Sequence, residues 1–159
     1  MPGVPIRVLF HSPRIPGNTG AAIRLSAGAG CELHLAGPMP FEFTDSHLKR
    51  AGLDYHDLAH VVVHDDLAAA YDALLPARIF AFSARASVRH TAIAYQQGDV
   101  LLFGPEPTGL DPEVLADPRV TEQLRIPMLP GRRSMNLANA ASVAVYEAWR
   151  QFDFVGATD

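Results

Sequence analysis

The sequence predicts an α/β fold built on one parallel sheet flanked by helices, in a single domain that spans residues 1–159. Short apolar runs of strand length alternate along the chain with segments of helical character, which is the pattern of parallel strands joined by crossover helices. With 48% hydrophobic and 19% charged residues, a chain of this length can bury roughly 70% of its unfolded surface in one core. We find no internal repeat, low-complexity tract or linker, so we expect one domain.

Six apolar runs are expected as strands. Each is rich in branched or aromatic side chains, and turn-forming residues follow several of them, such as Gly37-Pro38 after the second run. In chain order the expected strands cover residues 6–10, 33–36, 61–63, 79–82, 100–103 and 124–126.

Helices are expected between these strands and at the end of the chain. The helix expected over residues 65–75 has Asp65 or Asp66 as its N-cap and ends before Pro76. The helix expected in the polar segment 44–52 starts at Thr44 or Asp45. The expected helical ranges are 20–29, 44–52, 65–75 and 136–152.

The stretch Ile15-Pro16-Gly17-Asn18-Thr19-Gly20 follows the first strand and opens a helix. Free backbone N–H groups at a helix start bind anions, and Arg24, one turn inside, could reach the same phosphate or sulfate. Alternatively, Asn18 or Thr19 simply caps the helix and Arg24 is a solvated side chain. The stretch is neither a P-loop nor a G-x-G-x-x-G motif.

Two glycines, two prolines and one carboxylate follow the fifth strand within residues 104–110. Such a turn is stiff, and its bare backbone can approach a ligand closely. Glu106 is then a candidate partner for a ribose hydroxyl, an amine or a neighbouring backbone group. The alternative is an ordinary loop that leads to a helix near Asp111-Pro112.

Residues 134–139 form the third distinctive stretch, at the start of the closing helix. Ser134 is a candidate cap, while Asn136 and Asn139 lie three apart and could present both amides to one partner. An open parallel sheet binds its ligand at the carboxyl ends of its strands, and residues 104–110 and 126–128 lie at such ends. We therefore expect a cofactor pocket in the C-terminal third.

The overall charge argues against a strongly basic nucleic-acid binder, because the net charge is −4 and the pI is about 5.9. The cations are nevertheless clustered, at Arg24, at Lys49-Arg50 and at Arg132-Arg133. Local sign matters more than the sum, so binding of a polyanion stays open.

Cysteine and histidine usage points away from disulfides and metals. Cys31 is the sole cysteine and is expected to pack rather than to react. His60 and His64 share a strand face but lie about 13 Å apart, too far to bind one zinc. His56 and His60 have helical spacing but no third ligand nearby, so we expect no metal. No run approaches the roughly 18 apolar residues of a membrane span, and a cytoplasmic location is expected.

Three ordered segments carry a resemblance to a known family. They are Asn18-Thr19-Gly20 with Arg24, then Phe103-Gly104-Pro105-Glu106 with Gly109-Leu110, and then Ile126-Pro127-Met128 with Ser134-Met135-Asn136-Leu137. Together they look like the three signature motifs of the SPOUT superfamily of RNA methyltransferases. Residues 50–55 and 145–150 look like those of the short tRNA 2′-O-methyltransferases that modify the wobble nucleotide. The resemblance runs from about Ile6 to Phe152.

The resemblance implies a SPOUT-type sheet whose C-terminal segment threads a loop to form a trefoil knot. It also implies S-adenosylmethionine as cofactor, the tRNA anticodon stem-loop as partner, and a homodimer that grips RNA without an appended RNA-binding domain. By position, the implied cofactor contacts are Phe82, Gly104, Glu106, Gly109, Ile126, Ser134 and Leu137, and the implied substrate contacts are Asn18, Arg133, Asn136 and Tyr146.

The implied activity is 2′-O-methylation of the ribose at the wobble nucleotide, position 34, a cytidine or modified uridine, with leucine tRNA isoacceptors as the expected substrates. The matching arginine of the family, Arg24 here, is proposed to activate the hydroxyl. Because free arginine has a pKa of about 12.5 or higher, we expect Arg24 to act as a clamp that stabilises the developing alkoxide.

Three alternatives stay open because the motifs recognise the cofactor and not the target. The enzyme could methylate another tRNA position or ribosomal RNA. The same fold could also serve as a non-catalytic RNA-binding module, or as a plain phosphate-binding domain. Tyr146 and Trp149, three apart on the closing helix, suit a core or subunit interface, although the polar end of Tyr146 could touch a substrate.

Overall fold

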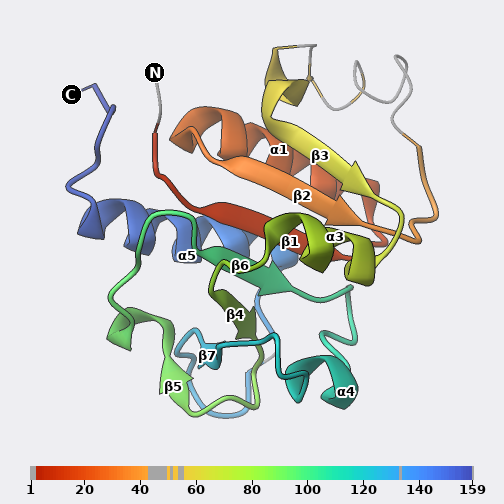
Figure 1. Cartoon of the computed structure of the whole chain (residues 1–159), viewed down its shortest axis with the longest axis vertical. Coiled ribbons are helices and arrows are strands. Elements are labelled where there is room, and N and C mark those ends of the chain that lie inside the picture. The colour runs from red at the N-terminus through yellow and green to blue at the C-terminus, as the bar shows by residue number, and fades with distance from the viewer. Residues whose placement is uncertain (1–2, 43–49, 51, 54–55, 133, 159) are drawn as a thin grey trace.

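One parallel sheet forms the centre of the molecule (Figure 1), a computed structural model that describes residues 3–42, 50, 52–53, 56–132 and 134–158. Its strands are β1 (Arg7–His11), β2 (Glu32–Ala36), β3 (Val61–His64), β4 (Ile79–Phe82), β5 (Val88–Arg89), β6 (Val100–Phe103) and β7 (Glu122–Arg125). Within the described residues, their order is β3-β2-β1-β6-β4-β7-β5, and every pair is parallel. The predicted α/β class is confirmed.

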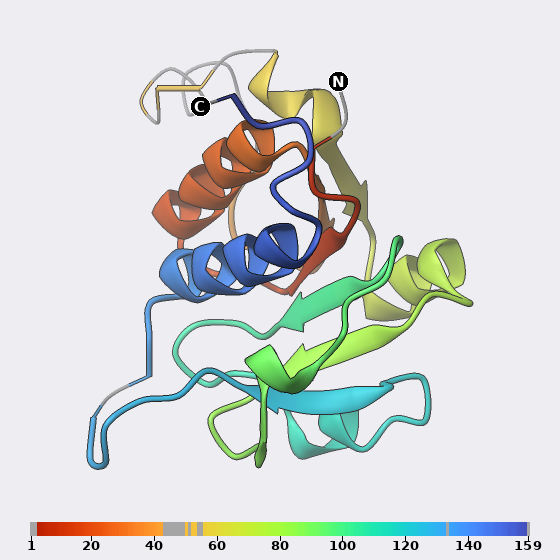
Figure 2. The ribbon, with the colours of Figure 1, turned by 90° about the vertical axis from the view of Figure 1, so that its left-hand side faces the viewer.

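Helices cover both faces of this sheet. They are α1 (Pro16–Ala29), α3 (Leu67–Leu74), α4 (Pro112–Leu115) and α5 (Leu137–Gln151), with short 3-10 helices η1 (Asp57–His60) and η2 (His90–Ala92). Figure 2 shows α1 and α5 side by side on one face, while α3 and α4 pack on the other. None of the described helices is long and apolar enough to cross a membrane.

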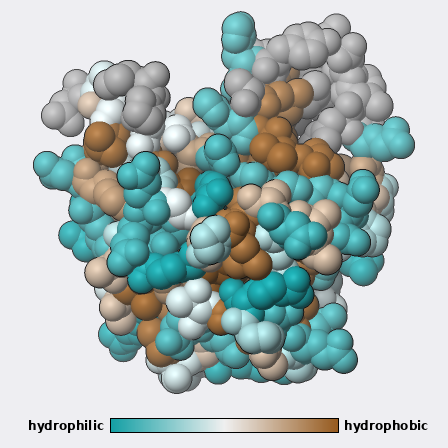
Figure 3. Space-filling model, in the orientation of Figure 1, coloured by the Kyte–Doolittle hydropathy of each residue, from teal (hydrophilic) through white to brown (hydrophobic). Residues whose placement is uncertain are grey.

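The core has two layers, one on each face of the sheet. Along β6, Leu101 and Phe103 belong to the layer beneath α1 and α5, whereas Val100 and Leu102 belong to the layer beneath α3 and α4. A central parallel strand buried on both faces is apolar throughout, which explains the continuous apolar runs in the sequence. On the outer surface that carries α3, Figure 3 shows hydrophilic residues interspersed with small hydrophobic patches.

Several predicted boundaries differ from the structure. The first helix begins at Pro16 rather than at residue 20, because proline at the first helical position is already in helical conformation. The last predicted strand, 124–126, is instead β7, which starts two residues earlier in a polar stretch. β5 was not expected, since two residues carry no periodicity. The predicted segment 44–52 lies largely outside the described residues.

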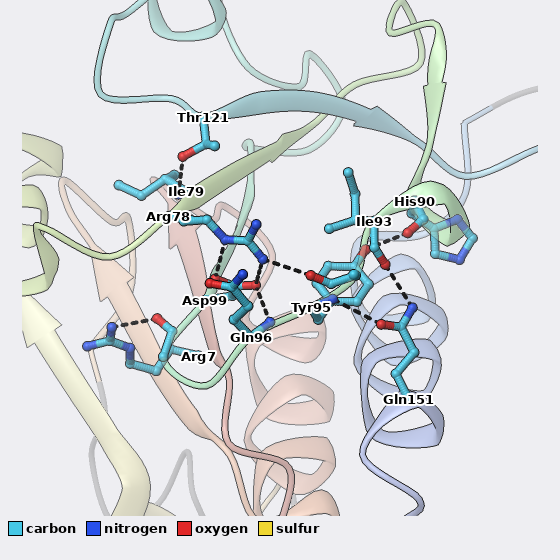
Figure 4. A network of polar contacts seen from close by, with 12 residues as sticks. Arg7, Arg78, Ile79, His90, Ile93, Tyr95, Gln96, Asp99, Thr121 and Gln151 are labelled. Carbon is cyan, nitrogen blue, oxygen red and sulfur yellow. Dashed lines mark hydrogen bonds and ion pairs between the residues drawn. The ribbon is translucent and has the colours of Figure 1, made fainter.

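A buried carboxylate closes the amino edge of the sheet, just before β6 (Figure 4). The Asp99 carboxylate accepts hydrogen bonds from Nε and Nη2 of Arg78 at 2.9 and 2.7 Å, and from the backbone N–H of Gln96 at 2.7 Å. Arg78 also donates to the carbonyl oxygen of Ala94 at 2.9 Å. The hydrogen bonds to Asp99 raise the pKa of Arg78, so Arg78 stays protonated.

Gln151 extends these contacts from the end of α5. Its side chain accepts from the backbone N–H of Tyr95 at 2.9 Å and donates to the carbonyl oxygen of Ile93 at 2.9 Å. The segment between η2 and β6 is therefore tied to both β4 and α5 (Figure 4). These contacts close the amino edge beside β4 and β6.

Candidate functional site

The carboxyl ends of β1, β6, β4 and β7 lie next to one another at one edge of the sheet. From β1 the chain runs outward to β2 and β3, whereas the later strands lie on the other side of β1. The strand order therefore reverses between β1 and β6, and open parallel sheets bind ligands in the crevice at such a point. Two of the segments singled out in the sequence follow β1 and β6 directly.

Glu106 joins the segments after β1 and β6. One of its carboxylate oxygens accepts from the backbone N–H of Arg14 at 2.8 Å, and the other accepts from the side-chain amide of Asn18 at 3.1 Å. The Asn136 amide donates in turn to Oδ1 of Asn18 at 2.9 Å. One chain of hydrogen bonds thus connects all three segments. The sequence allowed Glu106 to bind a ribose hydroxyl, an amine or a neighbouring backbone group, and in the structure it binds the backbone N–H of Arg14.

Asn136 is also the cap of α5. Its Oδ1 accepts from the backbone N–H groups of Ala138 at 2.9 Å and Asn139 at 3.2 Å. The expectation that Ser134 caps this helix is therefore wrong, and Ser134 lies exposed before it. Because the oxygen of Asn136 holds the helix and its nitrogen holds Asn18, the orientation of both amides is fixed.

The loop after β6 folds back on itself at Gly104. A Cβ atom there would lie 2.3 Å from the backbone nitrogen of Leu110 and 2.4 Å from the carbonyl carbon of Gly109. Gly109 adopts a φ of 72°, and its N–H donates to the carbonyl oxygen of Pro105 at 2.7 Å. The loop thus requires both glycines, one for close approach and one for a positive φ.

Apolar side chains meet at the same edge. Phe82, at the end of β4, stacks on Phe103 with ring centroids 4.5 Å apart and 17° between the planes. Leu137 belongs to the same core cluster, and the half-buried Ile126 packs against it. A Cβ atom at Gly109 would meet nothing within 4 Å, so there is open space beside this loop. Aromatic and aliphatic side chains beside bare backbone suit a flat heteroaromatic ligand.

Arg24 lies apart from the Glu106 hydrogen bonds. It is exposed on the third turn of α1, and its Nη2 approaches the carbonyl oxygen of Gly52 at 3.4 Å. Because α1 begins at Pro16, Arg24 stands two turns inside the helix, about 12 Å along its axis, and not one turn inside as the sequence predicted. Its guanidinium is directed toward the segment that precedes β3.

The other predicted substrate residues are only partly brought together. Asn18 and Asn136 are in contact. Tyr146 is 47% exposed on α5, with its ring edge-on to Trp149 at 5.5 Å, and ten residues along a helix separate it from Asn136 by about 15 Å. Arg133 lies outside the described residues.

Two histidines that the sequence reasoning did not consider lie at this edge. His11 ends β1, and burial lowers its pKa although the charge of Asp111 opposes the effect. The His90 ring centroid lies 6.5 Å from that of Phe82, and burial lowers the pKa of His90 as well. Both imidazoles are therefore neutral at pH 7, and positive charge at this edge comes from arginine.

The described arginines differ between the two edges. At the amino edge they have partners: Arg7 donates to the Gly98 carbonyl, Arg78 to Asp99, Arg119 to Asp117 and Arg150 to Glu147. At the carboxyl edge they are exposed and form no ion pair within the described part of the chain, as for Arg14, Arg85, Arg89, Arg125 and Arg132. Exposed, unpaired cations on one edge suit a polyanionic partner despite the negative net charge.

Neither cysteine nor metal chemistry has support at this site. Burial raises the pKa of the Cys31 thiol to about 11, so this residue packs and is not a nucleophile. Among the residues that the structure describes, no three or more His, Cys, Asp or Glu side chains are grouped to hold a metal ion. His64 instead contacts His34, with Nε2 and Nδ1 2.8 Å apart.

Comparison with known sequences places this geometry among RNA methyltransferases. Residues 5–146 match the SpoU rRNA Methylase family. The chain is 48% identical over 150 residues to a tRNA (cytidine(34)-2'-O)-methyltransferase of Methylovorus glucosotrophus, with 94% of this chain and 97% of the relative covered. It is 47% identical over 152 residues to a protein of the same name from Escherichia coli, with 96% and 97% covered.

Solved structures agree with these sequence matches. One, reported for structural insights into the 2-OH methylation of C/U34 on tRNA, superposes with a TM-score of 0.85 at 45% identity, over 93% of this chain and 96% of that chain. The SpoU methyltransferase AviRb from Streptomyces viridochromogenes, in complex with the cofactor AdoMet, gives a TM-score of 0.80 at 25% identity, over 96% of this chain and 62% of that chain.

Proposed function

The chain belongs to the SpoU methylase family, and we propose that it methylates the ribose 2′-oxygen of tRNA nucleotide 34, the wobble position, with S-adenosylmethionine as methyl donor. The proposal rests on 47–48% identity to tRNA (cytidine(34)-2'-O)-methyltransferases over 94–96% of this chain. The target is a cytidine or a modified uridine, and leucine isoacceptors are the proposed tRNAs. The protein acts in the cytoplasm, where tRNA is modified.

The carboxyl edge fits S-adenosylmethionine in its chemistry. The stacked Phe82 and the open space beside Gly109 suit the adenine ring. Glu106 fixes the loop that borders this space through its hydrogen bonds to the segment after β1. When bound, the cofactor supplies a methyl group that its sulfonium has already activated. The residues proposed to hold it are Phe82, Gly104, Glu106, Gly109, Ile126, Ser134 and Leu137.

The remaining task of the protein is to align the ribose hydroxyl with that methyl group. Holding two reactants in line can supply roughly 7–11 kcal/mol. Asn18 and Asn136 fix each other and are proposed to place the ribose, with Arg133 on the neighbouring RNA. The guanidinium of Arg24 clamps the nucleotide and stabilises the alkoxide that forms as the hydroxyl proton leaves to water.

A homodimer is proposed as the working unit, because Arg24 and Tyr146 stand away from Glu106 within one chain. α1 and α5 share a flank that leaves Val143 39% and Tyr146 47% exposed. A hollow of about 510 Å³ lies on this flank, between the end of α1 and residues 154–158. Pairing of this flank with a second copy would bury apolar surface and let each subunit contribute its arginines to the RNA surface of the other.

Replacing Val143 with arginine is expected to give a monomer, because the substitution places a charge in the proposed interface. Sedimentation velocity should show the fall in mass, and methyl transfer should fall with it. Val63→Arg is the matched control, since Val63 is 55% exposed on the outer strand β3. A Val143→Arg monomer that methylates tRNA at the wild-type rate would contradict the dimer proposal.

The trefoil knot is proposed from the path of the chain at the carboxyl edge. The loop after β6 and the segment that returns from β7 to α5 both cross this edge, and Asn18 connects Glu106 with Asn136 there. An experimental electron-density map in which the returning segment does not pass through the loop would contradict it.

The proposed function is tested by incubating the purified protein with total tRNA and methyl-labelled S-adenosylmethionine. Nuclease digestion and mass spectrometry should then find new 2′-O-methylcytidine or a 2′-O-methyluridine derivative at nucleotide 34. The label should be absent from tRNA whose nucleotide 34 already carries a 2′-O-methyl group. Label in ribosomal RNA or at another tRNA position would move the assignment to that target, and cofactor binding without transfer would leave a non-catalytic module.

A further inference from the structure

Two arginines stand opposite each other on the outermost strands at one side of the sheet. Arg89 of β5 and Arg125 of β7 are register partners, and partners on neighbouring strands lie about 4.8 Å apart with their side chains on the same face. Both residues are exposed. Like charges placed in this way destabilise a sheet, and within the described residues no carboxylate pairs with either of them.

The pair lies on the face of the sheet that carries α4. Alternation along β7 places Leu124 in the core beneath α5 and puts Gln123 and Arg125 on the other face, where Gln123 donates to the carbonyl oxygen of Leu115 at 3.1 Å. A hollow of about 350 Å³ opens here, and its lining includes Arg85, Ser87, Thr121, Glu122 and Gln123.

The pair also borders the proposed cofactor site. Arg125 directly precedes Ile126, and Arg89 directly precedes His90, whose ring lies beside Phe82. An anion held by the two arginines would therefore lie at the carboxyl ends of β5 and β7, on the opposite face of the sheet from Phe82. Within the described residues no ion pair engages either guanidinium group, so both are available to such an anion.

We propose that Arg89 and Arg125, with Arg85 at the adjoining hollow, bind a phosphate group of the tRNA backbone on the α4 face of the sheet. This inference rests on the proposed function. A phosphate between the two guanidinium groups replaces their repulsion with charge-assisted hydrogen bonds, and the planar fork of arginine matches phosphate oxygens. Backbone contacts position RNA without reading its sequence. Loss of the arginine pair should therefore weaken the binding of every tRNA.

The test compares the wild type with an Arg89→Ala/Arg125→Ala double variant. We expect the Kd for unmodified tRNA to rise about tenfold at physiological salt, and the slope of log Kd against log salt to fall by about 1 to 2. The Kd for S-adenosylmethionine, measured by calorimetry without RNA, should not change. Arg119→Ala is the control, because it removes a positive charge at the opposite edge, where Arg119 pairs with Asp117.

An Arg89→Glu variant separates binding from a structural role. Glutamate at this position creates an opposite-charge pair with Arg125 across the two strands, so the melting temperature should rise. Affinity for tRNA should fall further than in the alanine variant, because the site now repels phosphate. A structural role alone would move stability and tRNA affinity in the same direction.

Wild-type tRNA affinity and an unchanged salt slope in both variants would overturn the phosphate site. Lost affinity for S-adenosylmethionine with intact tRNA binding would overturn it as well, because the pair would then hold the cofactor carboxylate. A wild-type protein that binds tRNA through these arginines but transfers no methyl group would contradict the proposed function. The phosphate site would still stand, because its test measures only tRNA binding.

Discussion

Replacing Arg24 with alanine is expected to remove nearly all methyl transfer while the protein still folds and binds S-adenosylmethionine. Arg24 is exposed, and its described polar contact is a 3.4 Å approach to the carbonyl oxygen of Gly52, so folding loses little. Its proposed role is to stabilise charge that develops on the 2′-oxygen, and losing one such donor lowers kcat by about a hundredfold to a thousandfold. Single-turnover methylation of tRNA measures this loss.

Arg24→Lys is the companion variant, because it keeps the charge and loses the bidentate fork. Its rate should lie between those of the wild type and the alanine variant. Arg119→Ala, at an exposed arginine of the amino edge, controls for the change in net charge and should retain the wild-type rate. Wild-type turnover in Arg24→Lys would show that the fork is not used, and wild-type turnover in Arg24→Ala would remove Arg24 from the mechanism.

Gly104→Ala is expected to abolish cofactor binding and to lower stability. The added methyl group would lie 2.3 Å from the backbone nitrogen of Leu110, and backbone cannot swing aside as a side chain can. The loop would have to open, at a cost of about 2 to 3 kcal/mol, which corresponds to a fall of roughly 4 to 12 °C in melting temperature. Calorimetry with S-adenosylmethionine and a thermal melt measure the two effects.

Gly17→Ala is the matched control for this experiment. Gly17 lies in the first turn of α1, and a Cβ atom there would meet nothing within 4 Å. Alanine also favours the helix over glycine by up to about 1 kcal/mol, so the melting temperature should stay level or rise. If Gly104→Ala behaved like Gly17→Ala in both measurements, the tight loop would have no part in cofactor binding.

The fold class and the ligand-binding edge of the sheet could be predicted, because they follow from the apolar runs and from the residues at the ends of the strands. Four of the seven described strands, β1, β2, β4 and β6, have buried apolar side chains that form runs in the sequence. The rule that parallel sheets bind ligands at their carboxyl edge then predicts that Gly104 and Ile126 lie at one site. β5 was not predicted because its two residues form a strand only by pairing with β7, which lies more than thirty residues later in the sequence.

Side-chain partnerships were harder to predict. Glu106 bonds to Asn18 across 88 residues, and Asn136 bonds to Asn18 across 118 residues, separations at which no local pattern exists. Ser134 is a candidate cap in the sequence, but Asn136, directly before α5, is the residue that caps the helix in the structure. Arg24 lies apart from Glu106 because α1 begins at Pro16, which places Arg24 two turns inside the helix. The start of α1 depends in turn on where the chain leaves β1.

The central position of β1 has a consequence for how this protein is made. β1 can pair with β2, and β2 with β3, as soon as residue 64 has emerged from the ribosome, but the other edge of β1 must wait for Val100 to Phe103 of β6. At about 5–20 residues per second, synthesis leaves this edge open for roughly 2 to 7 seconds. Apolar strands with unpaired edges associate readily with other chains, so nascent chains are most prone to aggregate before β6 and the segments that follow it have been synthesised.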